Sequence, residues 1–74
     1  MAITDKYLVV NRIKELRTGA GMTRNALARA AELDAATVGR IEAGRLVPYD
    51  GQLAKIAQAL GVEDPETLME PLGA

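Results

Sequence analysis

Apolar residues recur at spacings of three and four along most of the chain, and a glycine or a helix-capping residue interrupts this pattern about every ten residues. The pattern predicts several short helices and no convincing strand, although residues 1–4 are compatible with a short edge strand. The chain has 74 residues and no cysteine, so it holds one small core without disulfide support. We therefore expect a single all-α domain over residues 1–74.

Capping residues and glycines indicate where the expected helices begin and end. Pro48 lacks an amide hydrogen and disfavours helical backbone before it, which predicts a loop over residues 45–49. The expected N-caps are Thr4, Thr23, Asp34, Asp50 and Asp64, and the expected terminators are Gly19 or Gly21, Gly44 and Gly61. The five predicted helices cover about residues 5–18, 24–31, 35–42, 51–60 and 65–70.

Each longer segment has one apolar face, which predicts the residues of the core. The charged residues between these positions are expected to remain in solvent. The expected inward residues are Val9, Ile13 and Leu16, then Leu27, Ala28 and Ala31, then Val38 and Ile41, and finally Leu53, Ile56, Ala57 and Leu60.

Composition excludes most catalytic chemistry. The chain has no histidine and no cysteine, which removes the usual zinc sites, thiol nucleophiles and histidine-dependent triads. No acidic pair stands beside a nucleophile or a phosphate-binding glycine loop, so we expect no enzyme, no cofactor and no small-molecule substrate. No apolar run approaches the roughly 18 residues of a membrane span, and no secretory signal opens the chain. We expect a cytoplasmic protein without a membrane partner.

The charges are distributed unevenly, although the formal net charge is only −1. Residues 6–45 carry eight basic and four acidic side chains, whereas residues 46–74 carry one basic and five acidic side chains. This asymmetry indicates either one part that binds a polyanion and another that is kept away from it, or an ordinary solvated mixture of charges. Two tyrosines are the only aromatic residues, too few for the stacking surface of a single-strand binder, so double-stranded DNA is the expected polyanion. For Tyr49, beside Pro48, packing over its loop is expected ahead of a hydrogen bond to a phosphate.

The two middle helices have the most informative spacing. Two capped helices of about two turns, joined by a turn of about three or four residues, match the helix-turn-helix unit, whose second helix lies in the DNA major groove. A wider resemblance is carried by Arg12-Ile13-Lys14-Glu15-Leu16-Arg17, Gly21-Met22-Thr23, Leu27-Ala28, Leu33-Asp34, Thr37-Val38, Arg40-Ile41-Glu42, Gly44, Leu53, Ile56-Ala57 and Leu60-Gly61-Val62.

In order and spacing, these residues resemble the Cro and phage-repressor (XRE-like) type of helix-turn-helix domain over about residues 12–69. The resemblance implies a compact, all-α, lambda-repressor-like domain of five helices that often binds palindromic operators as a dimer. It also implies a partly buried ion pair between Arg17 and Glu42, which would join the first and third helices.

The outward face of helix 35–42 is expected to meet base edges, because Val38 and Ile41 point inward. Arg40 can donate two hydrogen bonds to guanine O6 and N7, worth about 1–3 kcal/mol of discrimination, whereas alanine offers only apolar contact to thymine methyl groups. The family usually has longer polar side chains here. Gly39, inside the helix, costs about 1 kcal/mol relative to alanine. It either permits close approach of DNA or another helix or is merely tolerated. The expected base-contacting residues are Ala35, Ala36, Thr37, Gly39 and Arg40.

Phosphate contacts are expected on both sides of that helix. The resemblance implies that the start of helix 24–31 abuts a phosphate, where free amides and the positive end of the helix dipole favour an anion. Thr23 and Arg24 occupy this start, and arginine in place of the family's usual glutamine strengthens a phosphate role. Arg45, directly after Gly44, is the third expected phosphate contact.

Two functions follow from these expectations. The first is a sequence-specific transcriptional regulator of double-stranded operator DNA, in particular a Cro-like or phage-type repressor, since no sensor domain is evident. The second is a protein-interaction module on the same fold, such as an antitoxin or anti-repressor, because the short side chains of helix 35–42 provide little base contact. A homodimer would use residues near one terminus, either Leu68, Met69 and Leu72 or Ile3 and Leu8, unless these complete the core.

Overall fold

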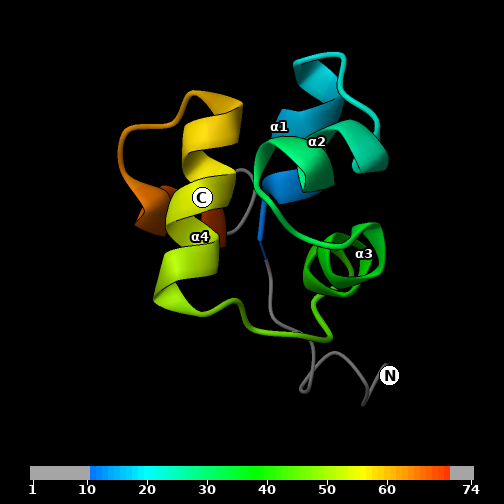
Figure 1. Ribbon diagram of the computed structural model, residues 1–74. Coiled ribbons are helices and arrows are strands. Elements are labelled where there is room, and N and C mark those ends of the chain that lie inside the picture. The colour runs from blue at the N-terminus through cyan, green and yellow to red at the C-terminus, as the bar shows by residue number, and fades with distance from the viewer. Residues whose placement is uncertain (1–10, 71–74) are drawn as a thin grey trace, which may run out of the picture.

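The computed structural model describes residues 11–70, and its regular secondary structure over that range is all helical (Figure 1). Four α-helices, α1 (Ile13–Gly19), α2 (Arg24–Ala30), α3 (Ala35–Glu42) and α4 (Asp50–Leu60), precede a short 3₁₀ helix, η2 (Pro65–Met69). The all-α prediction is confirmed. The fifth predicted helix is present as a 3₁₀ helix, because Thr67 and Glu70 donate their amides three residues back, to Asp64 and Thr67 at 3.1 and 3.2 Å.

The predicted bounds of the first helix are wrong within the described residues. Helix α1 begins at Ile13, and Asn11 and Arg12 lie before it in non-helical conformation. Asn11 Oδ1 accepts a hydrogen bond from the Ile13 amide at 3.1 Å, which satisfies one of the free donors at the helix start. The expected cap Thr4, the inward Val9, the remainder of helix 5–18 and the strand at residues 1–4 lie outside the described residues.

The other helix starts show which capping side chains are used. Thr23 Oγ1 accepts from the Ala26 amide at 3.0 Å, and Asp64 Oδ1 accepts from the Glu66 amide at 3.1 Å, so both expected caps are confirmed. Asp34 occupies the cap position of α3, but its side chain makes no capping bond. The expected cap Asp50 is wrong, because Tyr49 is the cap residue of α4 and its amide donates to Gln52 Oε1 at 2.9 Å.

All four α-helices end in the same way. The chain turns into left-handed conformation shortly after each helix, at Gly21 (φ 73°), Glu32 (φ 59°), Gly44 (φ 78°) and Gly61 (φ 74°). The next amide then donates to a carbonyl of the last helical turn, which closes the orphan acceptors of that turn. Glycine tolerates this conformation without cost, so Glu32 is the one terminator that sequence rules do not predict.

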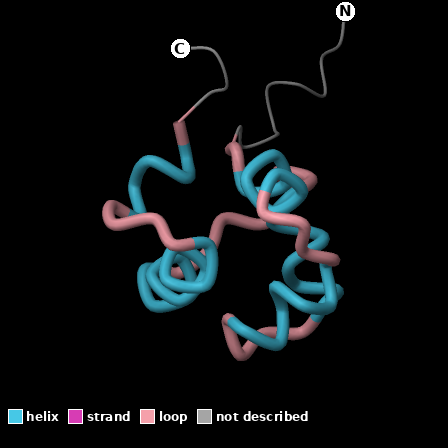
Figure 2. Tube along the Cα trace, turned by 90° about the horizontal axis from the view of Figure 1, so that it is seen from above, coloured by secondary structure: helices cyan, strands magenta, loops and turns pink. Residues whose placement is uncertain are grey.

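The core lies where α2 packs against both α3 and α4, with η2 against α4. Figures 1 and 2 both show α4 and η2 on one side of the molecule and the other helices on the opposite side. The predicted inward positions within the described residues are buried or half-buried, as expected. The fully buried apolar residues are Ile13, Leu27, Ala28, Ala31, Val38, Ile41, Ile56, Ala57 and Leu68.

The segment before α1 ties the two sides of the core together. Asn11 Nδ2 donates to the Ile41 carbonyl near the end of α3 at 2.8 Å, and the Arg12 amide donates to the Leu68 carbonyl of η2 at 2.9 Å. Leu68 is therefore part of the core and presents no free surface, while Met69 is half-buried. The other candidate dimer residues, Leu72, Ile3 and Leu8, lie outside the described residues. Within residues 11–70, no helix combines the length and the apolar character that a bilayer span requires.

Candidate nucleic-acid interface

Helices α2 and α3 form one packed unit, whose contact is built from side chains with no solvent exposure. Leu27 and Ala31 of the α2 segment and Val38 of α3 are all completely buried. Burial of Val38 and Ile41 orients α3 so that Ala36 and Arg40 are exposed on its outer face. Ala35, Thr37 and Gly39 are half-buried at its flanks. The structure thus places the five expected base-contacting residues on the outer face and flanks of α3, with Arg40 the longest of their side chains.

Glu42, at the end of α3, is held by α1. Arg17 Nε lies 2.6 Å from Glu42 Oε2, and Arg17 Nη2 donates to Oε1 at 3.2 Å. The two side chains are only 9% and 3% exposed. Arg17 Nη1 also donates to the Met22 carbonyl at 2.8 Å, so the guanidinium joins α1, the following turn and α3. The hydrogen bond to Glu42 raises the pKa of Arg17 above its ordinary value and keeps the guanidinium charged.

Arg24, the first residue of α2, reaches across α3 toward the same carboxylate. Its Nε lies 3.8 Å from Glu42 Oε1, and its side chain is 53% exposed. A Cβ atom built on Gly39 would meet Cδ and Nη1 of Arg24 at 3.5 Å and its Cζ at 3.6 Å. The Arg24 side chain therefore lies directly against α3 where that helix has no side chain of its own. The sequence indicated a close approach at Gly39, but did not predict that Arg24 makes it.

The remaining expected phosphate contacts lie at the start of α2 and just after the end of α3. Thr23 is exposed, and its hydroxyl oxygen caps α2. Arg45 is exposed, and its amide donates to the Arg40 carbonyl at 2.9 Å, in the turn that Gly44 makes possible. Arg40 and Arg45 thus bracket the end of α3.

One aromatic and one basic side chain, Tyr49 and Arg12, have solvent exposures that the sequence did not predict. Tyr49 is 78% exposed, so the expectation that it packs over its loop is wrong. Arg12 is half-buried, and its Nε is buried without a hydrogen-bond partner among residues 11–70. Sequence patterns give no signal for either outcome, because side-chain exposure at a helix end depends on tertiary packing.

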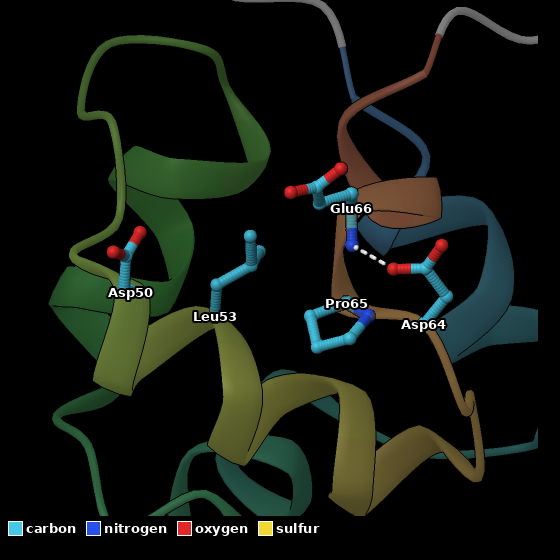
Figure 3. Close-up of a pocket in the computed structure, with 5 residues that line it drawn as sticks. All are labelled: Asp50, Leu53, Asp64, Pro65 and Glu66. Atoms are coloured by element: carbon cyan, nitrogen blue, oxygen red, sulfur yellow. Dashed lines mark hydrogen bonds between the residues drawn. The ribbon is translucent and has the colours of Figure 1, made fainter.

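A hollow of about 240 Å³ lies between the start of α4 and η2 and is unsuited to nucleic acid. Figure 3 shows Leu53 of α4 projecting between Asp50 on one side and the segment of Asp64, Pro65 and Glu66 on the other. Three carboxylates line this hollow with no basic side chain, so it repels a polyanion. No group of acidic residues suited to hold a metal ion occurs within residues 11–70.

Comparison with known proteins agrees with the α2–α3 geometry. A family model described as a helix-turn-helix domain matches residues 9–70. The chain belongs to the helix-turn-helix domain family. Within this helix-turn-helix domain, α2 and α3 are the two helices that give the family its name.

Several solved structures share the fold of this helix-turn-helix domain. The restriction-modification controller protein C.AhdI from Aeromonas hydrophila is 35% identical, with a TM-score of 0.72 over 77% of this chain and 85% of that one. The hypothetical transcription factor NHTF from Neisseria is 30% identical, with a TM-score of 0.75 over 82% of this chain and 67% of that one.

An HTH_3 family transcriptional regulator from Vibrio cholerae is 31% identical, with a TM-score of 0.68 over 82% of this chain but only 38% of its own length. The helix-turn-helix domain therefore also occurs as one part of a longer regulator. No curated protein sequence matches the chain.

Proposed function

We propose that this protein is a transcriptional regulator that binds a specific sequence of double-stranded DNA with α3 in the major groove. The observation that carries the proposal is the outer face of α3, where the exposed Arg40 stands among short side chains on a helix fixed by Val38 and Ile41. An α-helix of this kind fits the major groove of B-DNA. Support comes from the similar structures that are themselves named as controllers or transcription factors.

Arg40 is the residue with the chemistry for direct sequence recognition. Its guanidinium can donate two parallel hydrogen bonds to guanine O6 and N7, a pairing worth about 1–3 kcal/mol against the wrong base. Ala35 and Ala36 are short enough to let α3 approach the groove, where their methyl groups suit thymine. Thr37 and Gly39 complete this surface at its flanks.

Thr23 and Arg45 are proposed to contact phosphates on the two sides of the groove. Both residues are exposed, and each sits at the end of a helix of the α2–α3 unit. Such contacts fix the position of the protein on the duplex without carrying sequence information. The sequence also predicted a phosphate contact for Arg24. Unlike Thr23 and Arg45, Arg24 lies against α3 at Gly39.

Regulation then follows from occupancy of the operator, with no chemical step, cofactor or small-molecule substrate. We propose a repressor that competes with other proteins for its site and acts in the cytoplasm. If two copies bind a palindromic operator, the half-site centres should be about 10–10.5 base pairs apart or a multiple of this.

A second candidate function is a module that binds another protein. The loop between α3 and α4 exposes Leu46, Val47 and Tyr49, with Val47 60% exposed. Apolar side chains gathered on one exposed loop are typical of protein contacts. These residues differ from those proposed to contact DNA, so the two functions make separate predictions.

Selection from a randomised duplex library tests the proposal. The salt concentration should be about 0.1–0.2 M, because weak electrostatic binding is largely suppressed there. We expect the full chain to enrich a defined sequence, and the R40A variant to lose preference at one base pair of each half-site. Absence of any enriched sequence would contradict the proposal and favour the protein-binding module, for which substitutions at Leu46 and Val47 are the next test.

A further inference from the structure

The Arg24 side chain occupies the place on α3 where a side chain from position 39 would otherwise stand. Three of its atoms, Cδ, Nη1 and Cζ, are the nearest neighbours of a Cβ built on Gly39, at 3.5–3.6 Å. These distances are ordinary van der Waals contact, so the guanidinium rests on the helix surface. An arginine that only contacts a phosphate does not require such packing against a neighbouring helix.

Glu42 orients this guanidinium. The carboxylate is 3% exposed and is fixed by the bonds from Arg17, which makes it a rigid reference point at the end of α3. Arg24 faces it with Nε, at 3.8 Å from Oε1. With Nε turned toward the carboxylate, the terminal nitrogens remain available as a planar pair of donors, on a side chain that is 53% exposed.

Such a fork binds two acceptors side by side, a chemistry that DNA offers at a phosphate and at the O6–N7 edge of guanine. Two observations favour guanine. The guanidinium is packed against the helix proposed to enter the major groove, and the neighbouring carboxylate reduces the net charge that would attract a phosphate. Ordering the side chain before binding also lowers the entropy cost of a geometrically demanding contact.

We propose that Arg24 is a second specificity-determining residue, which contacts a guanine in the major groove from a seat formed by Gly39 and Glu42. The inference rests on the proposed function, since it requires α3 to enter the groove. The missing side chain at Gly39 then has a positive role: it leaves room for an arginine supplied by α2.

The test compares variants of the full chain on the selected operator and on its single-base-pair substitutions. The wild type should prefer guanine at the position contacted by Arg24 by at least about five-fold over the other bases. R24A should reduce this preference to near one-fold while leaving the preference due to Arg40 intact. R24K should also lose it, because lysine keeps the charge but has no planar fork.

Gly39 provides a matched pair of variants that leaves Arg24 in place. G39A should retain the guanine preference, because its Cβ fits in contact with Arg24, whereas the longer side chain of G39L should displace the guanidinium and abolish the preference. Circular dichroism of each variant checks that the helices are intact.

Each outcome has a distinct meaning. If R24A and R24K weaken binding to every sequence alike and leave all base preferences unchanged, Arg24 contacts only phosphate and the inference is wrong. If G39L keeps the guanine preference, the proposed seat is wrong. If the wild type enriches no sequence at all, the proposed function itself fails, and the role of Arg24 fails with it.

Discussion

Glu42 joins three helices through one carboxylate, because arginines from α1 and α2 both approach it at the end of α3. A carboxylate buried to this degree is stable only while its charge is paired and its oxygens accept hydrogen bonds. Arg17 supplies two such bonds, and the longer contact of Arg24 leaves its guanidinium partly free for DNA. If Arg24 contacts DNA as proposed, folding and recognition share Glu42.

Removal of Arg17 should destabilise the fold strongly. R17A leaves Glu42 buried with only the more distant Arg24 as a partner, and loss of one member of a buried pair costs about 3–5 kcal/mol. Urea unfolding followed by circular dichroism measures the change in the free energy of unfolding. K14A, an exposed residue of the same helix, is the control and should change it by less than about 0.5 kcal/mol. Equal stability of the two variants would contradict a structural role for the pair.

Glu32 should make stability depend on pH in the acid range. Lys55 Nζ lies 2.9 Å from its carboxylate, and this hydrogen bond lowers the pKa of Glu32 below its ordinary value of 4.5. A carboxyl whose pKa is lower in the folded state stabilises the fold above the unfolded pKa, and this contribution is lost as the pH falls through the folded pKa. We expect E32Q to be less stable than the wild type near neutral pH and equally stable near about pH 3. Urea unfolding at both pH values checks this, and a difference that does not change with pH would refute the role of the ionised pair.

At the residue scale, the ion pair between α1 and α3 was predictable from the sequence, whereas the contact between Arg24 and Gly39 was not. Arg17 and Glu42 were expected to pair from the resemblance, and the structure brings them to 2.6 Å. The reach of Arg24 over Gly39 could not be predicted, because it depends on the angle between α2 and α3. The glycine itself was the available signal, since it marks a close approach without naming the partner.

At the element scale, boundaries were predictable where a local side-chain bond or a glycine defines them. Helix α3 has the predicted bounds, and Gly44 and Gly61 terminate their helices in left-handed conformation as expected. The start of α1 was not predicted, although Asn11 makes a local side-chain bond there, because a long-range contact also holds the segment before it. The 3₁₀ geometry of η2 was not predicted either. The Arg12 amide bonds to the Leu68 carbonyl, which fixes both segments through tertiary structure.

Two glycines separate the effect of backbone conformation from that of space. A Cβ atom would meet nothing within 4 Å at either Gly61 or Gly51, but Gly61 has a φ of 74° and Gly51 lies within α4. G61A should lower the free energy of unfolding by about 1–2 kcal/mol, because left-handed backbone is strained for alanine. G51A should raise it by about 0.5–1 kcal/mol, because alanine is the better helix former. Thermal unfolding measures both, and changes of the same sign would contradict the conformational argument.

At the scale of the whole molecule, the fold places many of the basic and acidic side chains of the chain on different surfaces. Arg24, Arg29 and Arg40 lie on α2 and α3 and Arg45 follows α3 directly. The hollow at the start of α4, by contrast, has three carboxylates and no basic side chain. A net charge of −1 therefore does not oppose DNA binding, because the local field at the proposed interface is what a phosphate meets. The sequence predicted this division, but not which surfaces would present it.

The salt dependence of binding should report this local charge. If Arg45 contacts one phosphate, R45A should weaken binding to all sequences alike and reduce the slope of log K against log salt concentration by about one unit. Fluorescence anisotropy with a labelled duplex over a range of salt concentrations measures the slope. The control is K55A, which removes a lysine of α4 that pairs with Glu32, and it should leave the slope unchanged. An unchanged slope in R45A would show that Arg45 makes no phosphate contact.

Contact between α3 and DNA is tested most directly by amide chemical-shift mapping of the isotope-labelled full chain during titration with its selected duplex. We predict the largest changes at residues 35–40 and at Thr23, Arg24 and Arg45, with little change at Asp50, Leu53 and residues 64–66 around the acidic hollow. Changes concentrated around that hollow or on the loop of Leu46 and Val47, with α3 unaffected, would contradict recognition of DNA through α3.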